Sequence, residues 1–155
     1  MATYKREAFE TLEKRLREKR RFIQVITGPR QVGKTRLSLQ LKEAFPGECL
    51  YESADEPTLR DTAWLAQVWE SARRLARAGD GRKKALLILD EIQKVPRWPE
   101  TVKRLWDEDS RGSTPLQVLL LGSSQLLLQR GLSESLAGRF EVVRLSHWSF
   151  AEMKT

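Results

Sequence analysis

Residues 28–35 combine glycines, a lysine and a threonine at the spacing of a phosphate-binding loop. The segment reads Gly-Pro-Arg-Gln-Val-Gly-Lys-Thr and fits the pattern G-x-x-x-x-G-K-[ST] at every specified position. In such a loop the lysine reaches the β- and γ-phosphates, and the threonine hydroxyl completes the shell of a magnesium ion. We therefore expect Lys34 to contact the phosphates of ATP and Thr35 to help hold Mg²⁺. The candidate nucleotide-binding residues are Gly28, Pro29, Arg30, Gln31, Val32, Gly33, Lys34, Thr35 and Arg36.

The segments on either side of this loop have the character that such a site requires. An apolar run at 22–26 predicts a buried strand over 21–27, and leucines with strong helix formers predict a helix over 34–45. A strand, a loop and a helix in this order aim backbone amides and the positive end of the helix at an anion. The alternative is a chance match in a glycine-containing turn, which this placement disfavours.

The second half of the candidate site is the pair Asp90 and Glu91. Residues 85–89 are uniformly apolar, which is typical of a central parallel strand, and Asp90 ends that strand. An unpaired buried carboxylate is costly, and a magnesium ion beside Thr35 would account for it. Glu91 is then placed to act as the general base that deprotonates the attacking water. The alternative for Glu91 is a surface acid at the junction of strand and loop.

Ser123 and Ser124 follow another apolar strand, expected over 116–121. The carboxyl ends of parallel strands line the ligand crevice, so a hydroxyl there could hold the attacking water or contact the γ-phosphate. Serine is also a favoured N-cap, and the pair could simply begin the next helix. Both interpretations stay open.

Strands and helices alternate along the chain, which indicates a parallel sheet covered on both faces. Strands are expected over 21–27, 48–53, 85–90, 116–121 and 140–145. Helices are expected over 34–45, from the turn at 54–57 to about 77, over 98–107 and over 125–130. Residues 1–20 predict a separate basic amphipathic helix with Phe9, Leu12 and Leu16 on its buried face.

The net charge of +7, from 28 basic and 21 acidic residues, is compatible with contact to nucleic acid. Basic residues cluster at 14–21 and again at 73–84. The alternatives are a solvated helix face for the first group and helix C-termini for the second. Charge alone indicates non-specific attraction at most.

Composition excludes several other classes of protein. No apolar stretch approaches the roughly 18 residues of a membrane span, and the N-terminus lacks the apolar core of a secretion signal. The single cysteine, Cys49, cannot form an internal disulfide; we expect a small core residue and a cytoplasmic protein. His147 has no partner motif for metal or nucleophilic chemistry.

Five motifs occur in one order along the chain: the phosphate loop, Leu-Asp-Glu-Ile-Gln at 89–93, Gly-Ser-Ser at 122–124, Ser-Leu-Ala-Gly-Arg at 135–139 and Leu-Ser-His-Trp-Ser-Phe-Ala-Glu at 145–152. This combination resembles the prokaryotic AAA-type ATPases that carry an uncharacterised C-terminal domain. That group is related to the archaeal ATPases of the AAA+ superfamily. The resemblance runs from about residue 20 to residue 152, with a local departure at His147, where the family usually has proline.

The resemblance implies an α/β fold, the P-loop NTPase three-layer α-β-α sandwich, with five parallel strands in the order 5-1-4-3-2 over residues 21–155. It implies hydrolysis of Mg-ATP, a sensor polar residue after the fourth strand, and Arg139 as an arginine finger acting in trans in a homo-oligomer. The family's helical lid and C-terminal domain are not expected in a chain that stops at Thr155, so turnover is expected to be weak. The alternative function is a nucleotide-dependent switch on nucleic acid or protein with little hydrolysis. A small-molecule kinase fits Leu-Asp-Glu at the third strand less well.

Overall fold

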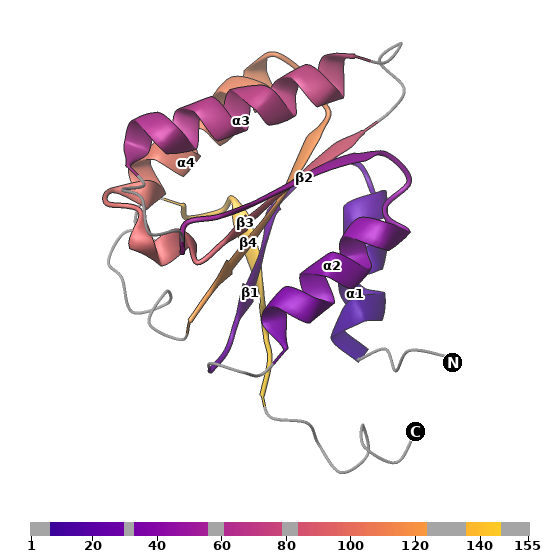
Figure 1. Ribbon diagram of the computed structural model, residues 1–155. Helices are drawn as coiled ribbons and strands as arrows, with labels where there is room; N and C mark the ends of the chain where they lie inside the picture. Colours follow the sequence, from indigo (N-terminus) through magenta and orange to yellow (C-terminus); the bar gives the residue numbers. More distant parts are fainter. Residues whose placement is uncertain (1–6, 30–32, 56–60, 79–83, 124–135, 147–155) are drawn as a thin grey trace.

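The computed structural model describes residues 7–29, 33–55, 61–78, 84–123 and 136–146 (Figure 1). The helices are α1 (Glu7–Arg17), α2 (Lys34–Ala44), α3 (Thr62–Arg77) and α4 (Trp98–Arg111), with a short 3₁₀ helix η1 (Ile92–Lys94). The strands are β1 (Ile23–Thr27), β2 (Glu48–Ser53), β3 (Ala85–Asp90), β4 (Leu116–Gly122) and β5 (Phe140–Arg144).

All five strands pair in parallel in the order β2-β3-β4-β1-β5. Read from the other side this is 5-1-4-3-2, so the predicted strand order is confirmed. Helices α1 and α2 cover one face of the sheet, and α3 and α4 cover the other (Figure 1). This is the three-layer arrangement of a P-loop NTPase.

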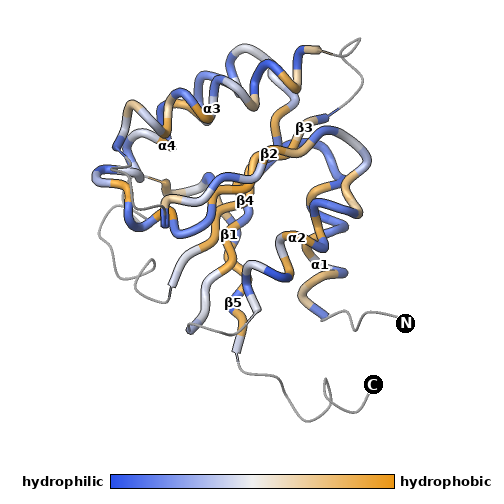
Figure 2. Tube along the Cα trace, viewed as in Figure 1, coloured by the Kyte–Doolittle hydropathy of each residue, from blue (hydrophilic) through white to orange (hydrophobic). Residues whose placement is uncertain are grey.

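The three central strands supply both faces of the sheet, since successive side chains on a strand point to opposite sides. On β3, Leu87 and Leu89 join the core under α3 and α4, whereas Leu86 and Ile88 join the core under α1 and α2. Every residue of β1, β3 and β4 is buried, and hydrophobic colour concentrates along these strands in Figure 2. The near-continuous apolar runs in the sequence follow from this double coverage.

The amphipathic character of α1 is confirmed, because Phe9, Leu12 and Leu16 are all buried in the core that α1 shares with α2. The helix is therefore packed on the sheet and continuous with the core. Cys49 is half-buried against the same cluster. None of the described helices has both the length and the apolar character that crossing a lipid bilayer requires.

The main difference from expectation is α4, which ends at Arg111 and not at residue 107. The polar run Glu108-Asp109-Ser110 looks like a surface turn in the sequence, but Asp109 is only 1% exposed. Its carboxylate accepts from Trp69 Nε1 at 2.8 Å and from Arg73 Nε at 2.6 Å, both on α3. This buried pairing keeps the last turn of α4 helical. The helix expected over 125–130 and His147 lie outside the described residues.

Candidate functional site

The sequence-predicted site gathers at the edge of the sheet where the strands end. Thr27 at the end of β1 is in register with Gly122 at the end of β4, and Ser53 of β2 is in register with Asp90 of β3. Gly28 therefore begins the phosphate loop beside the end of β4, which Ser123 follows. Ser124 and the loop residues Arg30, Gln31 and Val32 lie outside the described part of the chain.

Lys34 turns back onto the phosphate loop. Its Nζ donates to the carbonyl oxygens of Gly28 at 2.7 Å and Pro29 at 2.8 Å. Gly33, immediately before α2, has φ 94°, a backbone conformation that side chains disfavour. Burial lowers the pKa of Lys34, an effect opposed by the nearby Glu91 and Asp90 carboxylates. Two carbonyl oxygens of the phosphate loop thus hold the Lys34 ammonium near the N-terminus of α2.

Asp90 joins three elements of the fold through one carboxylate oxygen. Its Oδ2 accepts from Thr35 Oγ1 at 2.8 Å and from the hydroxyl of Tyr51 at 2.5 Å. These contacts connect the start of α2, the end of β3 and strand β2. Burial and the bond to Asp90 raise the pKa of Tyr51, so its hydroxyl stays a donor. Tyr51 was not singled out from the sequence; the available signal was its position near the carboxyl end of the strand that pairs with β3.

Glu91 directly follows β3 in the left-handed backbone region, with φ 55° and ψ 39°. This conformation, uncommon outside glycine, ends the strand abruptly and begins η1. Gln93 Nε2 donates to Glu91 Oε2 at 2.5 Å. The other amide atom, Gln93 Oε1, is buried and has no hydrogen-bond partner within the described structure. Gln93 therefore fixes the carboxylate of Glu91.

A hollow of about 460 Å³ lies over these groups. Its lining comprises Gly33, Lys34, Thr35, Arg36, Asp55, Glu91 and Lys94. An ion pair between Lys94 and Asp55 closes one side. The hollow thus brings together the loop residues 33–36 and Glu91, as the sequence predicted, and adds Asp55 and Lys94.

The oxygen atoms at this site suit magnesium. Thr35 and Asp90 offer a hydroxyl and a carboxylate, which are the hard ligands that Mg²⁺ prefers. Across the described residues no group of three His, Cys, Asp or Glu side chains could hold a metal.

Arg139 lies at the opposite edge of the sheet, where the strands begin, which we call the amino edge. It directly precedes β5, and its carbonyl oxygen accepts from the backbone amide of Ile23 at the start of β1, at 2.8 Å. Its guanidinium binds both carboxylate oxygens of Asp107, at 2.8 and 3.1 Å. This bond holds the pKa of Asp107 below its usual value. Because Arg139 is at the amino edge of the sheet, it is not placed at its own chain's phosphate loop.

The chain is similar in sequence to uncharacterised bacterial proteins. The chain is 36% identical over 122 residues to an uncharacterised protein of Mycobacterium tuberculosis, covering 79% of this chain and 24% of that protein. An uncharacterised protein of Mycobacterium bovis matches to the same extent. An uncharacterised protein of Haemophilus influenzae is 26% identical over 140 residues, covering 84% of this chain and 32% of its own length. The chain thus spans a quarter to a third of the curated relatives it matches.

The model of a protein family described as "AAA domain" matches residues 20–154. The match spans most of the chain, which therefore belongs to the AAA domain family, a membership that indicates a nucleotide-binding, ATPase-like function.

Proposed function

We propose that the chain binds Mg-ATP at the carboxyl edge of the sheet and hydrolyses it to ADP and phosphate. The observation that carries this proposal is the 2.8 Å bond between Thr35 Oγ1 and Asp90 Oδ2. It joins the phosphate-loop motif to the carboxylate at the end of β3, beside Glu91. Two segments 55 residues apart in sequence thereby meet at one hollow large enough for phosphate groups.

The residues of this hollow have distinct roles in the proposal. Lys34 exchanges the carbonyls of Gly28 and Pro29 for the β- and γ-phosphates. The backbone N–H groups of the loop residues 28–36, except Pro29, which has none, bind the remaining phosphate oxygens. Thr35 and Asp90 hold the metal, with Tyr51 fixing the Asp90 carboxylate. When bound, Mg²⁺ neutralises the charge that develops on the phosphate oxygens.

Glu91 is the proposed general base. Its carboxylate takes a proton from the attacking water, which must lie within hydrogen-bond reach of it. Ser123, or Ser124 beside it, orients that water or the γ-phosphate from the end of β4. Arg139 stabilises the transferring phosphoryl group on a neighbouring copy of the chain, since it is not placed to act on its own loop. The output is a conformational change passed to a partner or to the remainder of a longer protein.

A second candidate is a nucleotide-dependent switch with little intrinsic hydrolysis. It is favoured by the 2.5 Å bond from Gln93 to Glu91, which occupies the proposed base. In this alternative ATP binds at the same loop, but Glu91 keeps its hydrogen bond to Gln93 and does not act as a base. Nucleotide binding alone then changes the affinity for a nucleic acid or protein partner.

Two variants separate these functions. We expect Glu91→Gln to keep ATP affinity by calorimetry while phosphate release falls at least a hundredfold, because a positioned base typically contributes 10²–10⁴-fold. We expect Lys34→Ala to lose ATP binding. Glu100→Gln, which removes an exposed acid from the first turn of α4, is the control and should match the wild type in both assays. ATP binding with no wild-type phosphate release would select the switch. Unchanged ATP affinity of Lys34→Ala would refute both candidates.

A further inference from the structure

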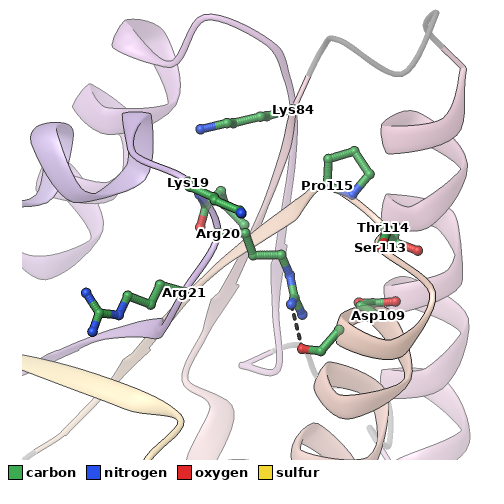
Figure 3. Close-up of a pocket in the computed structure, with 10 residues that line it drawn as sticks. Lys19, Arg20, Arg21, Lys84, Asp109, Ser113, Thr114 and Pro115 are labelled. Carbon is green, nitrogen blue, oxygen red and sulfur yellow. Dashed lines mark hydrogen bonds between the residues drawn. The ribbon is translucent and has the colours of Figure 1, made fainter.

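The amino edge of the sheet, opposite the proposed ATP site, carries two adjoining hollows. The larger, of about 490 Å³, lies between the connection from α1 to β1, the end of α4 and the connection from α4 to β4 (Figure 3). The second, of about 370 Å³, lies along α1 and the start of β1. Both are lined by Lys19, Arg21 and Gln117, so they form one elongated groove.

The groove carries more basic than acidic side chains, and the excess is greatest in the larger hollow. The second hollow adds Lys14 and Arg15 but also the acids Glu18 and Glu141. Four cations line the larger hollow, namely Lys19, Arg20, Arg21 and Lys84. The acid in the same lining, Asp109, is 1% exposed and already bound to Arg73. Its charge is therefore paired with Arg73 inside the molecule and also acts on Arg20, and no other acid of this lining faces Lys19, Arg21 and Lys84.

Two of the four cations build the walls of the groove. Arg20 donates to the carbonyl oxygens of Leu116 and Trp106 and to Ser110 Oγ, and it stacks 3.4 Å from the centroid of the Trp106 ring. Lys84 Nζ donates to two carbonyl oxygens at the end of α1, at 2.7 and 2.6 Å. These contacts fix the shape of the groove and keep two positive charges beside it.

The other two cations, Lys19 and Arg21, are exposed. Within the part of the chain that the structure describes, neither side chain makes an ion pair or a hydrogen bond. The Arg21 guanidinium lies 5.2 Å from the centroid of the Phe22 ring, which lines the second hollow. Figure 3 shows Arg21 extending away from Asp109 and Thr114, whereas Arg20 reaches toward them. Lys19 and Arg21 thus remain available at the junction of the two hollows.

We propose that this groove binds the phosphodiester backbone of a nucleic acid. A single small anion would need one hollow, whereas free cations at the junction of two hollows suit a polymer with regularly spaced phosphates. An aromatic ring beside a basic track is also the combination that binds single strands, because bases stack on the ring. Contacts of this kind carry no sequence preference, since phosphates are the same at every base.

Among its described residues, the second basic group of the sequence, at 73–84, contributes only Lys84 to this surface, and that side chain is bound to two carbonyl oxygens. In the second group, Arg73 is 11% exposed and bound to Glu108 and Asp109. The residues 79–83 lie outside the described structure. The first group supplies both Lys19 and Arg21.

The test measures binding of a fluorescein-labelled oligothymidylate of about 20 nucleotides by fluorescence polarisation, without ATP, at about 50 and 200 mM salt. We expect the double variant Lys19→Ala, Arg21→Ala to lose at least tenfold in affinity at low salt. The magnitude of its negative slope of log affinity against log salt should fall by about 1.4, because each lost phosphate contact removes about 0.7 for single strands. A duplex of equal length shows which form of the backbone fits better.

The matched control is Arg74→Ala, Lys103→Ala, which removes the same charge from α3 and α4 outside both hollows. It should bind the oligonucleotide within about twofold of the wild type. The proposal is overturned if the wild type does not bind at low salt, if the control loses as much as the groove variant, or if polyglutamate of equal charge competes as well as the oligonucleotide. Lys34→Ala should retain binding, which keeps this result separate from the ATP proposal.

Discussion

At the residue scale, Asp90 Oδ2 accepts two hydroxyl hydrogen bonds, and only one of the two donors belongs to the phosphate-loop motif. Thr35 is the motif residue, whereas Tyr51 comes from β2 and its hydroxyl has no role in a motif. A carboxylate held from two sides keeps one orientation, so its second oxygen is presented in a fixed direction. Tyr51 is therefore a positioning residue for the proposed metal ligand.

Tyr51→Phe should lower the free energy of unfolding by about 1.5 kcal/mol, because a hydrogen bond to a charged group contributes about 1.5–3 kcal/mol. Urea denaturation measures this change. In an Asp90→Ala background, Tyr51→Phe should lower the free energy of unfolding by less than half of this amount, because the acceptor of the hydrogen bond is already gone. An equal cost in both backgrounds would show that Tyr51 acts through packing and not through Asp90.

The residues of the candidate site could be predicted only in part from the sequence. Lys34 and Thr35 are candidates because they belong to one motif, and Glu91 because it follows an apolar strand; the structure brings all three to one hollow. Gln93 and Tyr51 could not be found in this way. Their roles depend on the backbone turn at Glu91 and on the lateral pairing of β2 with β3, and neither is encoded in a local spacing.

At the element scale, strands were more predictable than helix ends. The apolar runs of β1, β3 and β4 are buried throughout, and a parallel sheet covered on both faces makes such runs favourable. The predicted end of α4, at residue 107, was wrong because a long-range contact determines where this helix ends. Asp109 is polar in the sequence but buried in the fold, where Trp69 and Arg73 of α3 satisfy it.

This network predicts a large effect of one acidic side chain on stability. Asp109→Ala should lower the free energy of unfolding by about 3 kcal/mol, because it leaves Arg73 and the Trp69 N–H short of a partner in a buried position. Glu100→Ala, on the exposed face of the same helix, should change it by no more than about 0.5 kcal/mol. Urea denaturation of both variants distinguishes them, and similar values would show that the buried network contributes nothing particular.

At the scale of the whole molecule, the two edges of the sheet carry different groups. The carboxyl edge holds the proposed ATP site, and the amino edge holds both Arg139 and the basic groove. A residue that acts on the phosphates from the amino edge must do so on another copy of the chain. In this structure Arg139 is bound to both carboxylate oxygens of Asp107, so a role on another copy requires that it leave this pair.

A mixing experiment tests whether Arg139 acts between copies of the chain. Arg139→Ala keeps an intact phosphate loop, and Lys34→Ala keeps an intact Arg139, so each should release phosphate at least tenfold more slowly than the wild type when alone. In an equal mixture about a quarter of the interfaces pair an intact loop with an intact arginine, and activity should rise to a comparable fraction. The control mixture replaces Lys34→Ala with the double variant Lys34→Ala, Arg139→Ala and should stay inactive. Full activity of Arg139→Ala alone would show that Arg139 has no role in hydrolysis and serves only to bind Asp107. A mixture no more active than its parents at high protein concentration would exclude action in trans, because both halves of the interface are then present and still fail to complement.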